Sequence, residues 1–276
     1  MSGTQEFRLP PLPAPGGLAR VFAMPDLNGP RIRLGIVWFA LLCGALYGGL
    51  AWLGALYALV AGIASLQSAR EWQKVGSQPS RLVAFLAAAG MPAAAVFGIG
   101  LVGAVALALP AAALLATLWR RRWRTPLLAA AGCTVRVALF AGIAAAAPVI
   151  MYRTSVIGAI LLIGFICAFD MGNFMFGAEA ATPIPGIVAG LAVIAVVAGA
   201  ISVGVTVFEL EPFARPEHAW IFGGVVGLLA PFGEVVASLA LPAATAEAPA
   251  LRRLDSLILS GPAFVVLFFR YLGVTP

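Results

Sequence analysis

The stretch from Val156 to Gly177, VIGAILLIGFICAFDMGNFMFG, decides the fold because it reads as a membrane helix with one acid near its end. An apolar run from Val156 to Phe169 precedes Asp170. A charge at a bilayer centre costs roughly 2.5–3.5 kcal/mol on insertion scales, so an acid kept there usually faces the bundle interior, a cavity or a partner. Two other acids, Glu234 and Asp255, are placed to meet it. The three acids predict a polar site near one face of a membrane bundle.

The composition of the chain is that of an integral membrane protein. Its 276 residues are 62% hydrophobic and 10% charged, whereas a soluble domain is roughly half apolar and about a quarter charged. Several apolar runs approach the ~20 residues that span a bilayer, and they are continuous rather than alternating, which argues against a β-barrel. The predicted fold class is therefore all-α, a polytopic helical bundle. A net charge of +6 then reflects arginines in short loops rather than a nucleic-acid partner.

The apolar runs divide into about nine predicted transmembrane helices. The run from Leu34 to Leu66 is too long for one span, so we divide it near Gly48–Gly54. Residues 1–30 form a polar, Pro-rich segment, predicted to be a disordered cytoplasmic tail, and residues 31–276 form one membrane domain. The predicted helices cover residues 34–50, 52–69, 82–99, 101–118, 126–148, 155–176, 186–207, 219–241 and 255–273.

The distribution of arginine and lysine predicts the orientation of this bundle. With the N-terminus inside, nearly all basic residues fall in the inner segments 1–33, 70–81, 119–125, 177–185 and 242–254. The exceptions are Arg153, Arg215 and Arg270 outside and Arg136 within a helix. Cytoplasmic loops carry an excess of Lys and Arg, so we expect a multi-pass protein of the cell membrane, N-in and C-out. The basic run 120–124, flanked by Trp119 and Trp123, then reads as an interfacial anchor.

This topology places the three acids in one layer on the cytoplasmic side. Asp170 and Glu234 each precede the inner end of their helix by about two turns, which at about 1.5 Å per residue is roughly 10 Å. Asp255 begins the last helix at that surface. Carboxylates in a wet pocket suit Mg²⁺, and they equally suit a proton or cation path. The structural alternative is a set of helix-end polar residues that reach water.

The glycine and cysteine patterns of the chain indicate structural roles. The segment Gly98–Gly103 fits GxGxxG, but a dinucleotide site needs a preceding strand, and here the motif joins two apolar runs. The pairs Gly44/Gly48, Gly186/Gly190 and Gly223/Gly227 fit GxxxG and predict close helix packing. The cysteines lack metal-ligand spacing and are predicted to be buried packing residues; they are Cys43, Cys133 and Cys167.

Several segments together resemble the phosphatidate cytidylyltransferases, also called CDP-diacylglycerol synthases. That family ends a membrane helix with Asp-x-Gly-Ala-Tyr-x-x-Gly, and residues 170–177 follow this pattern with Phe174 for the Tyr. Residues 182–186 and Gly190 look like a shortened form of its Ser-Pro-Lys-Lys segment. Residues 233–238 resemble its Gly-Asp-Leu-x-Glu-Ser, and residues 252–256 its Asp-Arg-x-Asp-Ser signature. The resemblance covers roughly residues 31–276 in the same order.

The resemblance implies a reaction and a set of functional residues. The reaction would be CTP plus phosphatidate giving CDP-diacylglycerol and pyrophosphate, for phospholipid synthesis, with Mg²⁺ as cofactor. CTP, phosphatidate and membrane lipids are the expected partners, together with a second copy of the chain in a homodimer. The implied catalytic and metal-binding residues are Asp170, Glu234 and Asp255. The implied substrate-binding residues are Arg252, Arg253, Ser256, Gly172, Gly177 and Ser238.

The chain also departs from the family pattern at charged positions. Glu234 stands for an Asp, Ala237 for a Glu and Arg252 for an Asp, and residues 243–250 replace a Pro-Gly-His-Gly-Gly loop. The two lysines of the Ser-Pro-Lys-Lys segment are missing. Two alternatives therefore stay open: a catalytically degenerate relative that acts as a lipid-binding or regulatory protein, and a small ion-coupled transporter.

Overall fold

The computed structural model describes residues 31–120, 126–177, 182–208, 213–243 and 246–273, and this part of the chain is helical. The predicted N-terminal tail and most of the 120–124 anchor lie outside the described residues. The helices are α1 (Arg31–Gly48), α2 (Leu50–Lys74), α3 (Arg81–Ala95), α4 (Ile99–Arg120), α5 (Leu127–Thr154), α6 (Val156–Gly177), α7 (Ile184–Phe208), α8 (Glu217–Ala240), the short 3₁₀ helix η2 (Leu251–Arg253) and α9 (Leu257–Leu272).

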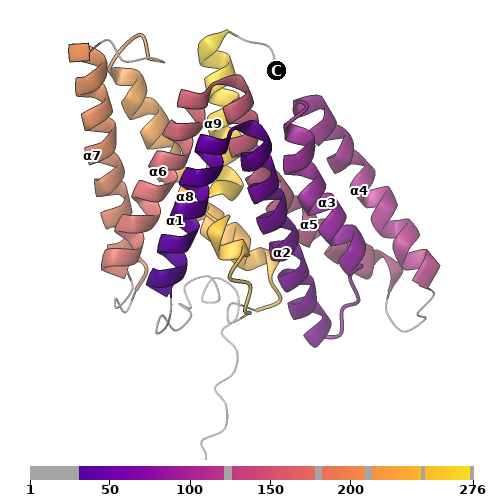
Figure 1. The fold of residues 1–276 in the computed structure, drawn as a ribbon. Helices are drawn as coiled ribbons and strands as arrows, with labels where there is room; N and C mark the ends of the chain where they lie inside the picture. Colours follow the sequence, from indigo (N-terminus) through magenta and orange to yellow (C-terminus); the bar gives the residue numbers. More distant parts are fainter. Residues whose placement is uncertain (1–30, 121–125, 178–181, 209–212, 244–245, 274–276) are drawn as a thin grey trace, which may run out of the picture.

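The helices form a bundle of membrane type. In the described part of the chain, seven segments are long and apolar enough to cross a bilayer: those of α2, α4, α5, α6, α7, α8 and a segment that joins η2 to α9. Two shorter apolar helices, Gly35–Gly48 and Arg81–Ala95, complete the set. Successive helices run in alternating directions, so that α1 begins at the lower end of the bundle and α9 finishes at the upper end (Figure 1). The predicted helical membrane bundle is confirmed.

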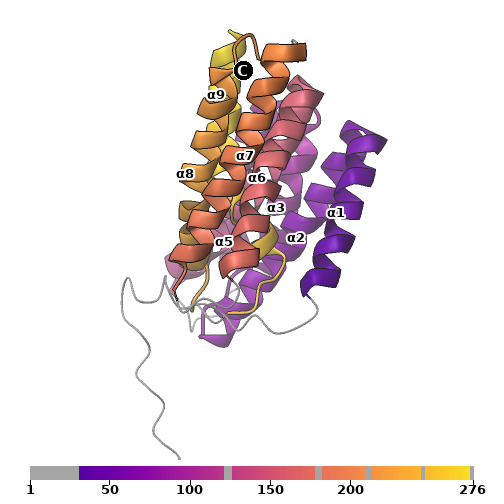
Figure 2. The same cartoon turned by 90° about the vertical axis from the view of Figure 1, so that its left-hand side faces the viewer.

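Helix α5 lies at the centre, where it packs against α2, α3 and α9. The central part of the helix is rich in alanine, and Ala141, Ala144 and Ala145 are completely buried. In lipid the hydrophobic effect does not drive helices together, so their association depends on close packing. Small side chains let helix backbones approach closely. Helix α1 lies at the side of the bundle in Figure 2, and α4 and α7 lie at opposite sides in Figure 1. All three expose many large apolar side chains.

Two of the three predicted GxxxG pairs mediate close packing. A Cβ at Gly190 would lie 2.7 Å from the Phe169 ring of α6, and one at Gly223 would lie 3.1 Å from the Phe165 ring. Gly186 and Gly227 are equally confined. In the first pair the prediction is wrong for Gly44, where a Cβ would meet nothing within 4 Å, whereas a Cβ at Gly48 would lie 2.7 Å from the Trp52 ring at the start of α2. Helix α1 turns Gly44 away from its neighbours.

Several predicted boundaries shift for identifiable reasons. Helix α2 continues through the predicted polar loop to Lys74, because Trp72 donates a hydrogen bond to the Ala240 carbonyl (2.9 Å) and Lys74 pairs with Glu71 (2.6 Å). Helix α5 continues past Pro148 through Arg153, which was expected in a connection and instead donates to the Val96 carbonyl (2.7 Å).

The turn between α3 and α4 also corrects a predicted boundary. Helix α3 ends at Ala95, four residues before the expected end, and Gly98 then takes a φ of 147° that favours glycine. Helix α4 begins at Ile99, inside the GxGxxG segment. A helix rather than a strand therefore precedes the motif, which confirms that it is not a dinucleotide fingerprint.

The cysteines differ in burial more than the sequence indicated. All three are free thiols. Cys133 is buried as predicted, but Cys43 is exposed on α1 and Cys167 is half-buried on α6. The expectation of buried packing is therefore wrong for Cys43, which lies on a helix with few neighbours, and incomplete for Cys167.

Candidate functional site

The candidate site lies at the lower end of the bundle, where α6 and α8 finish and α9 begins (Figure 1). Helix α6 contributes Asp170 and Asn173, helix α8 contributes Glu234 and Ser238, and the η2–α9 connection contributes residues 252–256. These segments are far apart in sequence. Their meeting agrees with the predicted layer of acids near one surface of the bundle.

Ser256 links two of the acids. Its hydroxyl donates to Asp170 Oδ1 at 2.5 Å, and the same oxygen lies 3.4 Å from Asp255 Oδ1. The backbone N–H of Ser256 also donates to Asp255 Oδ1 at 2.8 Å, which fixes that carboxylate at the start of α9. Asp255 is buried, whereas Asp170 is exposed on the side of α6. The hydroxyl thus joins an accessible carboxylate to a buried one.

Glu234 is held in place by the helix that carries Asp170. The side-chain amide of Asn173, one turn after Asp170, donates to Glu234 Oε1 at 2.7 Å. The residue before Glu234 lets the helices approach, because a Cβ at Gly233 would lie 2.2 Å from the Asp255 carbonyl oxygen. Helix α8 therefore touches the backbone of the η2–α9 connection, and Gly233 has a packing role in the Gly-Glu motif.

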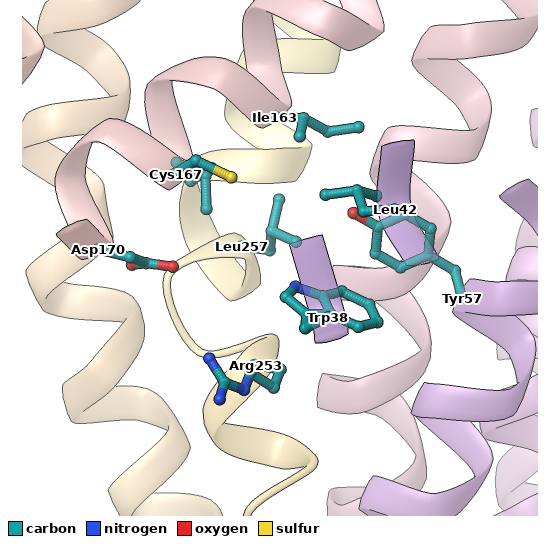
Figure 3. Close-up of a pocket in the computed structure, with 9 residues that line it drawn as sticks. Trp38, Leu42, Tyr57, Ile163, Cys167, Asp170, Arg253 and Leu257 are labelled. Carbon is teal, nitrogen blue, oxygen red and sulfur yellow. The ribbon is translucent and has the colours of Figure 1, made fainter. Parts of the chain in front are cut away.

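Two arginines of η2 supply positive charge to this cluster. Arg252 lies 3.9 Å from Asp255 Oδ2 and donates a long hydrogen bond to Ser238 Oγ at 3.4 Å. Ser238 in turn donates to the Glu234 carbonyl oxygen at 3.0 Å. Arg253 points instead toward Asp170 and lines a pocket beside it (Figure 3). The three carboxylates repel one another and the two guanidinium groups offset part of that repulsion.

The structure brings together seven of the nine residues predicted for the site. The glycines Gly172 and Gly177 lie elsewhere, on the side of α6 that packs against α7. A Cβ at Gly172 would lie 2.7 Å from the Ala189 carbonyl oxygen, and one at Gly177 would lie 3.1 Å from the Gly186 Cα. Helix packing accounts for both glycines. Their predicted contact with substrate has no counterpart in this geometry.

A pocket opens between α1 and α6 next to Asp170 (Figure 3). It has a volume of about 20 Å³, and its lining residues come from α1, α2, α6 and the η2–α9 connection. Most of the lining is apolar, and Asp170 and Arg253 provide its polar edge. The lining residues are Trp38, Leu42, Tyr57, Ile163, Ile166, Cys167, Asp170, Arg253 and Leu257.

Sequence reasoning missed part of this arrangement. Asn173 was within reach, because it follows Asp170 by three residues and so shares its helix face. Trp38 and Tyr57 gave no signal, since an aromatic residue in an apolar run usually reads as core or as a membrane-interface anchor. Their ring centroids lie 6.1 Å apart in an edge-on contact that joins α1 to α2.

The donor chemistry of the site fits a hard divalent cation, with two carboxylates rather than three. In the described residues, no group of three or more His, Cys, Asp or Glu side chains converges to hold a metal ion. Mg²⁺ is usually bound by one or two carboxylates together with water and substrate phosphates. Asp170 and Asp255, which share the Ser256 hydroxyl, supply such a pair. Glu234 accepts a hydrogen bond from Asn173 and adds a third negative charge beside this pair.

No family model, curated protein or solved structure matches the chain.

Proposed function

We propose that the protein is a membrane-embedded nucleotidyltransferase that transfers the cytidylyl group of CTP to phosphatidate and releases pyrophosphate. The observation that carries this proposal is the linked pair of carboxylates, Asp170 and Asp255, with Arg252 and Arg253 on the preceding turn. Acids that could bind a metal beside cations that could bind phosphates are the parts that phosphoryl transfer requires. The choice of CTP and phosphatidate rests on the motif resemblance.

The orientation forms part of the proposal. We infer nine crossings, with the N-terminus and the candidate site on the cytoplasmic side of the cell membrane. The lower end of the bundle in Figure 1 holds the end of α2, the start of α3 and η2, which carry Arg70, Lys74, Arg81, Arg252 and Arg253. The upper end holds the end of α5, the start of α8 and the end of α9, at or near which lie Arg153, Arg215 and Arg270. An excess of basic residues marks the cytoplasmic face, where CTP is available.

The proposed reaction is a displacement at phosphorus. A phosphate oxygen of phosphatidate attacks the α-phosphorus of CTP, the bond from that phosphorus to the oxygen bridging the β-phosphorus breaks, and pyrophosphate leaves with the electron pair. Asp170 and Asp255 would hold Mg²⁺, which neutralises charge on the phosphates when bound. Arg253 would pair with phosphate oxygens at the edge of the pocket, because guanidinium groups bind phosphates in bidentate fashion. Arg252 would keep Asp255 oriented.

A transfer assay on the purified full-length protein in liposomes tests the proposal. It uses labelled CTP, phosphatidate and Mg²⁺, with Asp170→Asn and Asp255→Asn as variants. Both substitutions keep the side-chain shape but remove the charge, so we expect turnover to fall by about 100-fold or more. The matched control is Glu217→Gln, since Glu217 is an exposed acid at the other end of α8, paired with Arg215 at 3.7 Å. Exposed pairs contribute little, so this variant should keep wild-type turnover.

The outcomes separate the candidate functions. Turnover that is lost in both Asp variants and kept in Glu217→Gln supports the proposal. Wild-type turnover in Asp170→Asn contradicts the metal site. If the folded wild-type protein transfers nothing yet binds phosphatidate, the lipid-binding or regulatory alternative is favoured. Cation-dependent transport without transfer would favour the transporter.

A further inference from the structure

The polypeptide between α8 and η2 joins two halves of the candidate site. Glu234 lies on α8 before this connection, and Asp255 lies after it. The carbonyl oxygen of Ala240 and the backbone N–H of Ala250 mark the two ends. The intervening residues 241–249 could extend over about 30 Å. The contacts that hold the two ends therefore determine how the two halves of the site meet.

Helix α2 holds both ends of this connection through side chains. Trp72 donates from Nε1 to the Ala240 carbonyl oxygen at 2.9 Å. The Gln67 side-chain oxygen accepts a hydrogen bond from the Ala250 N–H at 3.0 Å. Trp72 follows Gln67 on α2 by little more than one helical turn, which is about 7.5 Å along the axis. Helix α2 also packs directly against η2, so it fixes where the connection starts and where it ends.

Each anchored alanine is close to a charged part of the site. The Ala250 carbonyl oxygen accepts a hydrogen bond from the Arg253 backbone N–H at 3.2 Å, within the turn of η2. Ala240 is the last residue of α8, and the turn before it carries Ser238, whose hydroxyl oxygen accepts from Arg252 at 3.4 Å. The two anchors therefore lie within one turn of side chains that contact each other across the site.

Trp72 is itself held from the central helix of the bundle. The guanidinium carbon of Arg136 on α5 lies 5.6 Å from the centroid of the Trp72 ring, within the range of a cation–π contact. The last carbonyl groups of a helix have no partner within that helix, and the Trp72 N–H satisfies one of them in α8. Arg136, the basic residue within a predicted span, thus supports a tryptophan that joins three helices.

We propose that Trp72 and Gln67 are positioning residues: from α2 they hold the two ends of the α8–η2 connection, and so place Asp255 and the arginines of η2 beside Glu234. Neither side chain lines the pocket beside Asp170, so both act through the backbone groups that they bind. The two hydrogen bonds form a clamp that does not depend on any reaction. Only its effect on turnover rests on the proposed function.

Hydrogen exchange, measured by mass spectrometry on the full-length protein in detergent micelles, tests the clamp without turnover. Trp72→Phe keeps an aromatic ring but removes the donor, and Gln67→Leu keeps a side chain of similar size but removes the acceptor. Loss of one hydrogen bond raises the population of a locally open state roughly fivefold. Peptides that cover residues 246–256 should therefore exchange about fivefold faster in both variants. Peptides from α4 and α7 should keep their wild-type rates.

Two further variants of α2 serve as controls. Gln67→Glu keeps an oxygen that can accept from the Ala250 N–H, so exchange should stay close to the wild-type rate. Ser68→Ala changes the residue next to Gln67, which is 1% exposed and whose hydroxyl has no hydrogen-bond partner in the described part of the chain, so exchange should not change. Wild-type exchange of residues 246–256 in Trp72→Phe or Gln67→Leu would overturn the proposal. Equal acceleration in Gln67→Glu or Ser68→Ala, or acceleration spread evenly over the bundle, would do the same.

The transfer assay separates positioning from a general loss of folded protein. In Trp72→Phe and Gln67→Leu the Mg²⁺ concentration that gives half-maximal turnover should rise several-fold, because residues that orient metal ligands tune metal affinity. A smaller amount of folded protein would lower turnover without moving that concentration. An unchanged Mg²⁺ dependence in a protein whose connection exchanges faster would reject the positioning role. Faster exchange in a protein that never transfers CTP would leave the clamp standing and reject the proposed reaction.

Discussion

Helix α6 is held very differently on its two sides. On one side it meets α7 through glycines, so closely that a Cβ at Gly172 or Gly190 would collide with backbone or ring atoms of the other helix. On the other side it faces α1 across an apolar pocket, and the two helices make no extensive contact. The same helix is thus fixed along one face and accessible along the other.

This difference explains how an acid can be both positioned and reachable. The α7 side sets the height and rotation of α6, and with them the position of the Asp170 carboxylate. The α1 side leaves that carboxylate exposed. A rigid contact and an open face on one helix would allow a site to keep its geometry while a ligand reaches the carboxylate.

The largest effect is expected from a substitution that breaks the tight side. In Gly190→Leu the new Cβ would lie 2.7 Å from the Phe169 ring and 3.0 Å from its carbonyl oxygen, so the helices must separate. We expect a loss of about 3 kcal/mol of stability, the upper range for overpacking, measured by thermal unfolding in detergent micelles.

The control for this variant lies on α6, the helix that carries Phe169. Gly164→Leu introduces the same side chain where a Cβ would meet nothing within 4 Å, and leucine is the better helix former by several tenths of a kcal/mol. Gly164→Leu should unfold at or above the wild-type temperature. Equal destabilisation of both variants would show that the glycine contact does not determine the packing of α6.

A second prediction tests whether the close contact between α6 and α7 also positions the acids of the candidate site. Asn173 lies near Gly186 of α7 and donates to Glu234 on α8, so it transmits the α6–α7 geometry to the third acid. Hydrogen bonds to charged groups contribute about 1.5–3 kcal/mol. We therefore expect Asn173→Ala to lower kcat of the proposed transfer by about tenfold or more, with the KM for phosphatidate unchanged because Asn173 does not line the pocket.

Phe174→Ala serves as the comparison for Asn173→Ala. Phe174 is the next residue and is exposed, so its truncation should leave kcat within about twofold. An increase in the KM for lipid without a fall in kcat in Asn173→Ala would place this residue in lipid binding and not in positioning Glu234.

A third prediction closes the open side. Cys43 on α1 follows Leu42, which lines the pocket, and Cys167 lines the pocket from α6. Bridging them with a short bismaleimide should hold α1 against α6 and reduce turnover in the proposed transfer assay by about tenfold, in line with closure of an access route. Bismaleimides of different lengths then show which distance between the two thiols can be bridged.

The cysteines themselves supply the controls. In Cys43→Ser the same reagents can modify Cys167 but cannot join the helices, so any fall that remains is due to occupation of the pocket by the reagent. A bridge that forms in the wild-type protein, confirmed by mass spectrometry, without any change in turnover would show that access to Asp170 does not depend on the pocket between α1 and α6.

The same contrast separates what the sequence could predict from what it could not. Span lengths and loop charges depend on local composition, so the helical bundle, the lower-end location of Asp170, Glu234 and Asp255, and the packing role of Gly186 and Gly190 followed from the chain. The loosely packed side of α6, which faces α1, could not be predicted from the sequence. In a membrane, a peripheral helix and a packed helix have the same apolar composition. The pairing of Trp38 with Tyr57 and the exposure of Cys43 depend on the rotation of α1, which its sequence does not fix.

The smallest expected effect concerns how α1 is attached. At its upper end, Tyr152 of α5 donates to the Leu46 carbonyl oxygen at 3.1 Å, and the turn at Gly49 (φ 95°) joins α1 to α2. In Tyr152→Phe this hydrogen bond, which contributes about 1 kcal/mol, is lost while the ring remains. We expect Cys167 to react a few-fold faster with a membrane-permeant maleimide, because α1 is then held less firmly over the pocket.

The control is Tyr47→Phe, which also removes a tyrosine hydroxyl. Tyr47 follows Leu46 in the chain and is 97% exposed. Cys167 should then react at the wild-type rate, and the buried Cys133 gives an internal reference in each sample. If Tyr152→Phe leaves the Cys167 rate unchanged, the pocket is open without any movement of α1. In that case, the accessibility of Asp170 is a fixed property of the bundle.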